Sequence, residues 1–215
     1  MNKKVIELNT KFNTEYTNKL LNNWHIFNEI YEKCNLNFDK GCGSYLFDGI
    51  TYDYCDSMYE KQELLFNKVK TATNVLEIGT YMGHSIFIML LSNPNLHITC
   101  IDIDDKYTEP SIKLLNKYFN NNITFIKKPS LEALNNIIEK FDFFHIDGHH
   151  ENTYIEKEFI KIIELNNNKN NILRVVFDDQ NCMTKLQNKI EMSYTIIKKT
   201  IPMCKWNNIY YEIQL

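Results

Sequence analysis

Short apolar runs alternate with helical patterns of hydrophobic residues from Asn74 to the end of the chain. Five of the runs have the length and nearly continuous apolar character of buried parallel strands. Between them, apolar residues recur at intervals of three and four, as on the buried face of a helix. This alternation predicts an α/β fold, a parallel sheet with helices on its faces. The predicted strands are Asn74–Gly79, His97–Ile103, Ile123–Lys127, Phe141–Asp147 and Leu173–Asp178.

The N-terminal residues predict helices outside this core. From about Thr10 to Cys34, aromatic and aliphatic residues recur with helical spacing and predict one amphipathic helix. Ser57 and Glu60 have the spacing of a capping box, which predicts that a second helix begins there. We expect residues 1–70 to form these helices and a lid or substrate loop within the same domain as the core, residues 71–215.

The C-terminal residues predict an antiparallel hairpin. A helical stripe of apolar residues runs from Leu186 to Ile197. Beyond it, apolar and polar residues alternate from Ile209 to Leu215, as in a half-buried strand. We expect this strand to pair with Thr200–Trp206 across a turn at Asn207-Asn208. With the five parallel strands, the hairpin completes a mostly parallel, seven-stranded sheet.

Composition narrows the class of protein. The 215 residues are 44% hydrophobic and 24% charged, and no apolar run approaches the roughly 20 residues of a membrane span. The N-terminus lacks a secretory pattern and the six cysteines are scattered, so we expect a cytoplasmic protein with reduced thiols. The net charge of −3 argues against nucleic acid as the main substrate and favours a small molecule or sugar.

Candidate chemistry lies where the predicted strands end, since ligands of such sheets bind beyond the carboxyl ends of the strands. The first strand ends in Glu77-Ile78-Gly79, and Gly83 precedes a helix. Glycines let backbone amides approach a ligand, so this turn is typical of a nucleotide-type site. A purely structural turn is the alternative. Asp102 ends the second strand, where a carboxylate can accept both hydroxyls of a ribose. Ser130 follows the third strand, as a helix N-cap or as a contact to adenine.

Three carboxylates end the fourth and fifth strands at the same edge: Asp147, Asp178 and Asp179. Like charges in one cleft raise each other's pKa unless a cation neutralises them, and a hard divalent ion is the simplest candidate. Oxygen ligands suit Mg²⁺, with Mn²⁺ or Ca²⁺ as alternatives, whereas the nearby imidazoles would favour a softer metal. Alternatively, one aspartate caps a helix and another faces solvent. His150 is placed to take a proton from a substrate hydroxyl, and His149 is the second candidate for this role.

Taken together, these motifs resemble the class I S-adenosylmethionine-dependent methyltransferases, which have a Rossmann-like, doubly wound fold. The segment Leu76–Ser85 is similar to the L-E-[IL]-G-x-Y-x-G-x-S turn of the catechol O-methyltransferase group. The segments Ile146–His150 and Val176–Asp179 resemble the I-D-G-x-H and F-D-D motifs of macrolide-sugar O-methyltransferases. Pro129, where an acidic or small residue often precedes the serine, departs from the pattern.

The resemblance implies roles for residues that the motifs contain. Asp102 would hold the ribose of S-adenosylmethionine, Ser130 would lie near adenine, and His150 would be the base. Asp147, Asp178 and Asp179 would bind the divalent cation. The remaining cofactor residues would come from the first strand and its turn: Glu77, Gly79, Thr80, Tyr81, Gly83 and Ser85.

The function expected from this resemblance is metal-dependent O-methylation of a small molecule, such as a sugar, a nucleotide sugar or a catechol. Two alternatives stand beside it: a metal-independent methyltransferase acting on RNA or protein, and an inactive cofactor-binding scaffold. The apolar N-terminal helix permits a homodimer. We expect the segment 41–54 to be a lid whose aromatic residues stack on a substrate ring or only pack: Tyr45, Phe47, Tyr52 and Tyr54.

Overall fold

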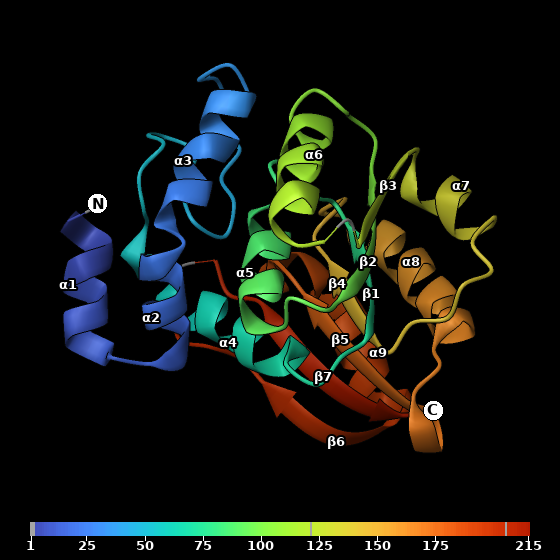
Figure 1. Ribbon diagram of the computed structural model, residues 1–215. Helices are drawn as coiled ribbons and strands as arrows, with labels where there is room; N and C mark the ends of the chain where they lie inside the picture. The colour runs from blue at the N-terminus through green and yellow to red at the C-terminus, as the bar shows by residue number, and fades with distance from the viewer. Residues whose placement is uncertain (1–2, 121, 205) are drawn as a thin grey trace.

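The computed structural model describes residues 3–120, 122–204 and 206–215. Within these ranges, seven strands form one sheet in the order β3-β2-β1-β4-β5-β7-β6 (Figure 1). Strands β1 to β5 run parallel, and β7 runs antiparallel to both β5 and β6. The predicted α/β class with a C-terminal antiparallel hairpin is confirmed. The strands are β1 (Asn74–Ile78), β2 (His97–Asp102), β3 (Ile123–Lys127), β4 (Phe143–Ile146), β5 (Ile172–Phe177), β6 (Thr195–Thr200) and β7 (Ile209–Gln214).

Helices cover both faces of the sheet (Figure 1). Adjacent strand residues enter different cores: Val75 packs with residues of α4, α5 and α6, and Leu76 with residues of α7, α8 and α9. Because the strands are buried on both faces, their apolar runs are nearly continuous. The elements are α4 (Tyr59–Val69), α5 (His84–Ser92), α6 (Thr108–Tyr118), α7 (Ser130–Leu134), α8 (Asn152–Leu165), α9 (Thr184–Ser193) and the 3₁₀ turns η1 (Asp56–Met58), η2 (Lys169–Asn171) and η3 (Gln180–Met183).

The strand order reverses between β1 and β4, which lie side by side with Ile78 opposite Ile146. The chain leaves β1 toward α5 on one face and leaves β4 toward α8 on the other. The two connections therefore diverge and open a crevice at the carboxyl ends of the strands. Residues that follow Ile78 and Ile146 meet in this crevice.

The prediction of one continuous N-terminal helix from Thr10 to Cys34 is wrong. In the described part of this region, the chain forms α1 (Lys3–Phe12), α2 (Glu15–Asn22) and α3 (Trp24–Lys33). Asn13 adopts a left-handed φ of 45°, and the Thr14 side chain caps α2, so the helix stops and restarts. The predicted apolar stripe is nevertheless buried along α2 and α3, as Leu20 and Phe27 show.

The predicted capping box at Ser57 is also wrong. Residues 56–58 form η1, the N-cap of α4 is Met58, and no side chain caps that end among the described residues. The Ser57 hydroxyl instead contacts the Cys55 thiol at 3.1 Å. The domain division at residue 70 stays a prediction, although Leu20, Phe27 and Ile86 lie in one continuous core.

The first strand of the hairpin lies earlier in the sequence than predicted. Helix α9 ends at Ser193, and β6 occupies Thr195–Thr200, where the β-branched run Thr195-Ile196-Ile197 favours a strand over the predicted helix. The described residues 201–204 and 206–208, here called the 201–208 connection, contain no strand, and Lys205 of the predicted strand Thr200–Trp206 lies outside the described residues. Asn208 is fully buried, and its amide donates to the Tyr45 hydroxyl at 3.1 Å, so it cannot sit at an exposed turn.

The most apolar helix, α5, is buried over its whole length of nine residues. Across the described ranges, every helix falls short of the length or the apolar character that crossing a membrane would require.

Candidate active site

A cavity of about 750 Å³ opens at the carboxyl ends of β1, β2, β4 and β5. One side is built by the ends of the strands and the turns after them. The other side is built by the lid loop (residues 41–54), by α4 and by Trp206. Of the predicted site residues, those that line the cavity are Gly79, Thr80, Tyr81, Ser85, Asp102, Ser130, Asp147, His150, Asp178 and Asp179.

Gly79 is required by backbone packing. Its φ is +81°, and a Cβ atom there would lie 2.1 Å from the carbonyl oxygen of Asp147. The end of β1 therefore touches the end of β4 too closely for any side chain at this position. The sequence interpretation attributed this glycine to the approach of a ligand, and the packing against Asp147 gives it a second and sufficient cause.

The turn after Gly79 is held by Asp102. One carboxylate oxygen accepts the backbone N–H groups of Thr80 at 2.9 Å and of Tyr81 at 2.7 Å, and the other accepts the Asp104 N–H at 3.0 Å. The carboxylate fixes the turn, in which Tyr81 has a left-handed φ of 49°. Asp102 also lines the cavity, so its predicted contact to a ribose stays open as a prediction.

Glu77 lies beneath the cavity wall. Its side chain is fully buried, accepts the Ser85 hydroxyl at 2.5 Å and contacts the His145 Nδ1 at 2.9 Å. Gly83, with a left-handed φ of 70°, also lies away from the cavity, packed toward Leu115. Within the described residues, the lining of the cavity includes Ser85 but neither Glu77 nor Gly83. Their assignment as cofactor-binding residues stays a prediction.

His145 joins the strand ends to the lid. Its Nε2 lies 2.8 Å from the Tyr45 hydroxyl, and its Nδ1 lies beside the Glu77 carboxylate. Although burial lowers the pKa of His145, the hydrogen bond to Glu77 and its charge raise that pKa above the usual value. The interpretation of His145 as a structural residue agrees with this buried position.

Ser130 is not a helix N-cap. It is the first residue of α7, the cap position is Pro129, and the Ser130 hydroxyl donates to Glu158 at 2.5 Å. Glu158 is fully buried on α8, and burial raises its pKa to about 7. The sequence interpretation missed this glutamate because it lies on a helix and away from every strand end. The predicted contact between Ser130 and adenine stays a prediction.

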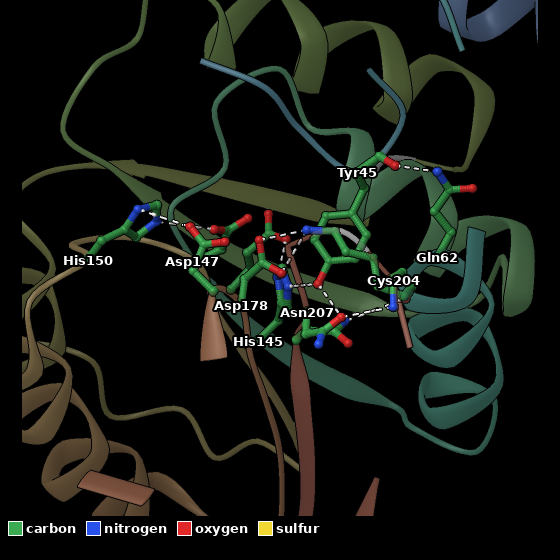
Figure 2. A network of polar contacts seen from close by, with 12 residues as sticks. Tyr45, Gln62, His145, Asp147, His150, Asp178, Cys204 and Asn207 are labelled. Atoms are coloured by element: carbon green, nitrogen blue, oxygen red, sulfur yellow. Dashed lines mark hydrogen bonds and ion pairs between the residues drawn. The ribbon is translucent and has the colours of Figure 1, made fainter. Parts of the chain in front are cut away.

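The three predicted metal ligands have different partners. The Asp178 carboxylate is buried and accepts two hydrogen bonds from the Lys61 ammonium, both at 2.9 Å. Asp147 and Asp179 instead face His150, whose Nε2 and Nδ1 lie 3.6 Å and 3.2 Å from their oxygens. Figure 2 shows His150, Asp147 and Asp178 in a row that leads to Tyr45. Lys61 therefore places a positive charge of this chain beside Asp178.

His150 has the geometry expected of a base at this edge. The neighbouring Asp147 carboxylate raises the pKa of His150 to about 8, and burial together with Asp178 raises the pKa of Asp147 to about 7. His149 also lines the cavity, but its Nε2 lies 3.9 Å from a Glu151 oxygen and its ring packs on Tyr154 at 4.7 Å between centroids. Of the two candidates, His150 is the histidine that contacts these aspartates.

The donor set fits the predicted magnesium site poorly. Among the described residues, the side chains whose donor atoms lie within 4.8 Å of one another are His150, Asp179 and Cys182, a group with an imidazole and a thiol. Mg²⁺ prefers oxygen ligands, whereas imidazole and thiol suit softer ions. Asp178 already holds Lys61. Metal binding by Asp147, Asp178 and Asp179 therefore stays a prediction.

The lid loop closes the other side of the cavity. Tyr45 and Phe47 line it, as the sequence interpretation allowed, but Tyr52 stacks on Phe27 and Tyr54 donates to Gln62, so these two only pack.

His84, at the start of α5, holds this lid. It contacts the Ser44 hydroxyl through Nδ1 and the Tyr52 hydroxyl, at 2.9 Å, through Nε2. Burial lowers the pKa of His84 to about 3.

Sequence reasoning missed the residues that α4 and the 201–208 connection contribute to the cavity. Met58 and Lys61 come from η1 and α4, and Trp206 comes from the connection. One signal was present: Lys61, Leu64 and Leu65 share one face of α4, and a lysine among buried leucines needs a buried acid. Trp206 had been assigned to a strand, which hid its position.

A family model described as a methyltransferase domain matches residues 76–172, from within β1 to the start of β5. Residues 76–172 are therefore similar to a methyltransferase domain. The predicted resemblance to class I methyltransferases is confirmed by this match and by the sheet order. The matched segment is a little under half of the chain and includes the glycine turn, Asp102, Ser130, Asp147 and His150.

Two relatives are similar to this chain in sequence, and one solved structure is similar to it in fold. Tapetum-specific methyltransferase 1 of Arabidopsis thaliana is 27% identical over 46% of this chain and 45% of its own length. An A. thaliana protein named as a candidate caffeoyl-CoA O-methyltransferase is 33% identical over 38% of this chain and 37% of its own. The matches thus span less than half the length of both plant proteins. An O-methyltransferase of Bacillus cereus, solved in complex with SAH, shares the fold with a TM-score of 0.61 and 16% identity over 88% of this chain and 90% of that one.

Proposed function

We propose that the chain binds S-adenosylmethionine in the cavity and transfers its methyl group to a hydroxyl of a small molecule. One observation carries the proposal: a single cavity of about 750 Å³ joins the glycine turn and Asp102 to His150 and Asp147. A cavity of this size suits a cofactor and a small acceptor together. The O-methyltransferases among the similar proteins support the choice of reaction.

The residues on the strand-end side fit the cofactor. Asp102 offers carboxylate oxygens to ribose hydroxyls, and the Ser130 oxygen, which donates its proton to Glu158, keeps lone pairs for an amino group of adenine. Ser85 lines the cavity at the start of α5 and donates its hydroxyl proton to Glu77, so the N–H groups at this helix N-terminus are what favour a carboxylate there. When bound, the cofactor supplies a methyl group on a positively charged sulfur.

The residues around His150 fit the activation of a hydroxyl. His150 removes the proton, and the carboxylates of Asp147 and Asp179 on either side stabilise the imidazolium that forms. The acceptor oxygen then attacks the methyl group in line with the bond that breaks, so the protein mainly aligns the two reactants. In this proposal neither the proton transfer nor the methyl transfer involves a metal ion, because Lys61 already pairs with Asp178.

The acceptor proposed is a sugar, a nucleotide sugar or a catechol. Tyr45, Phe47 and Trp206 line the lid side of the cavity and offer ring faces to such a molecule. The net charge of −3 provides no field to gather a polyanion, which disfavours the alternative of an RNA substrate.

The test is an assay for S-adenosylhomocysteine over a panel of sugars, nucleotide sugars and catechols. We expect turnover with at least one class, and we expect His150→Ala to lower kcat by about a hundredfold while cofactor affinity stays within about twofold. His149→Ala is the matched control and should retain activity. Cofactor binding without product from any acceptor would favour the scaffold alternative, and the absence of cofactor binding would refute the proposal.

A further inference from the structure

An ion pair inside the cavity wall links the lid side to the strand-end side. The Lys61 ammonium of α4 contacts both oxygens of Asp178, which follows β5, and only 4% and 7% of the two side chains is exposed. Lysine and aspartate are rarely buried to this extent unless they are paired. Both residues also line the cavity.

The Lys61 ammonium is engaged by Asp178 and by the Tyr45 ring. A protonated lysine carries three N–H donors. Two contact Asp178, and the Nζ atom lies 4.4 Å from the centre of the Tyr45 ring, which offers its electron-rich face to the remaining charge. Lys61 therefore acts on the cavity through Asp178, as a positioning residue, and not by touching an acceptor.

Surrounding contacts fix the lysine in this place. The Asn208 amide donates to the Tyr45 hydroxyl at 3.1 Å and to the Lys61 carbonyl oxygen at 3.5 Å. The Gln62 amide donates to the Tyr45 carbonyl oxygen at 2.5 Å, a contact seen in Figure 2. An exposed lysine could move away from a metal ion, but Lys61 is buried on α4 between the lid and Asn208.

A divalent ion on Asp178 would face this fixed positive charge. If the ammonium and a divalent ion shared one carboxylate, the two cations would lie close together and repel each other strongly, because the cavity wall is poorly solvated. The ion would also have to take oxygens that the ammonium already holds.

We propose that Lys61 is the resident cation of the carboxylate cluster, so that Asp178 is not a metal ligand and the methyl transfer needs no divalent ion. The part of this proposal that concerns methyl transfer rests on the proposed function. The part that concerns Asp178 can be tested without any substrate.

The experiment titrates the purified full chain with Mn²⁺ alone and follows free Mn²⁺ by electron paramagnetic resonance. We expect the wild type and Asp178→Asn to bind Mn²⁺ alike, because Asp178 of the wild type is not expected to bind the ion. Lys61→Gln removes the charge but keeps two N–H donors near Asp178, and it should bind Mn²⁺ at least about tenfold more tightly than the wild type. Lys113→Gln, at an exposed lysine of α6 paired with Glu109, is the matched control and should match the wild type.

Each outcome has a definite meaning. Binding of Mn²⁺ to the wild type that Asp178→Asn abolishes would overturn the proposal, as would a folded Lys61→Gln with no gain in affinity. Binding that survives Asp178→Asn but is lost in Cys182→Ser would lie at His150, Asp179 and Cys182 and would support it. Near-ultraviolet circular dichroism checks the fold of Lys61→Gln, and if that variant does not fold, the comparison of wild type with Asp178→Asn decides.

A second measurement uses turnover. With an acceptor from the panel, excess EDTA should change the kcat of the wild type by less than about twofold, and a loss of tenfold or more would overturn the proposal. Failure of the proposed function is recognised separately, because S-adenosylmethionine would then not bind, while the Mn²⁺ titration would still report on Asp178.

Discussion

The two sides of the cavity are built in different ways. The strand-end side comes from residues that directly follow β1, β2 and β4, and its geometry is fixed by backbone contacts such as Gly79 against Asp147. The lid side comes from segments far apart in sequence, residues 41–61 and 201–208, and is held by buried side chains such as Lys61 and Asn208. Backbone packing fixes one side, and charge and hydrogen bonds fix the other.

This difference explains where chemistry can vary. A turn determined by strand register leaves little freedom for substitution, as expected for a part that holds a constant ligand. A wall made of side chains can change its shape and charge by single substitutions. We therefore expect the lid side to determine the proposed acceptor and the proposed independence from a divalent cation.

The largest expected effect is on the free energy of unfolding, and it compares Gly79, which packs against the backbone, with Gly41, where an added Cβ would meet no other atom. Gly79→Ala places a Cβ against the Asp147 backbone at a left-handed φ, and we expect the free energy of unfolding to fall by about 4 kcal/mol. Gly41→Ala in the lid has a similar φ of +86° but meets no atom within 4 Å, and should cost about 1 kcal/mol. Urea denaturation measures both, and equal losses would contradict the assignment of Gly79 to packing.

A second comparison uses neighbouring aspartates. Asp178→Asn leaves the Lys61 ammonium buried without its counter-charge, which should lower the free energy of unfolding by about 3 kcal/mol. Asp179→Asn removes a charge that faces the more exposed His150 and should change it by less than about 1 kcal/mol. The same urea measurement applies, and a smaller loss at Asp178 than at Asp179 would show that the buried pair does not hold the lid side.

His84 couples the two sides in a pH-dependent manner. Its pKa of about 3 in the folded chain lies below the ordinary value of about 6.5, so the unfolded chain binds the proton first as the pH falls. The stability that His84 contributes is present above pH 6.5 and is lost toward pH 3. Between pH 6.5 and 5, the wild type should lose about 2 kcal/mol more than His84→Gln does.

The control for this pH effect is His97→Gln, at an exposed histidine that begins β2. It should keep the pH dependence of the wild type. Thermal denaturation at several pH values measures all three proteins, and a His84→Gln curve parallel to that of the wild type would be the contrary result.

The smallest expected effect concerns the turn. Asp102→Asn keeps the shape of the side chain but accepts the Thr80 and Tyr81 N–H groups more weakly, so affinity for S-adenosylmethionine should fall about tenfold. Asp104→Asn, at an exposed residue that accepts the Lys106 N–H, should leave affinity within about twofold. Calorimetric titration compares the two, and equal affinities would contradict a role of Asp102 on the strand-end side.

Sequence patterns predicted most of the fold and one side of the site. Apolar runs mark the positions of buried parallel strands. The residue that ends such a run, such as Asp102 or Asp147, therefore lies at the carboxyl edge of the sheet. The lid side could not be predicted in this way. Lys61 and Glu158 lie on helices. The sequence around them does not indicate that Lys61 contacts Asp178 or that Glu158 contacts Ser130, because both contacts depend on the tertiary structure.

The errors at the chain ends have a similar cause. One apolar stripe extends over α2 and α3, and the period of three and four cannot show that Asn13 and Asn23 interrupt the helix. At the C-terminus, Asn207 and Asn208 have the composition of a turn, but the buried contact of Asn208 with Tyr45 on the lid decides their position. Tertiary contacts determined both outcomes.

The central claim is that the strand-end side of the cavity holds S-adenosylmethionine. Calorimetric titration of that cofactor into the wild-type chain tests it most directly, since it requires neither an acceptor nor a metal ion. We predict saturable binding of one molecule per chain below about 1 mM ligand, displaced by S-adenosylhomocysteine. Absence of saturable binding at that concentration, in a chain whose circular dichroism shows it to be folded, would contradict the claim.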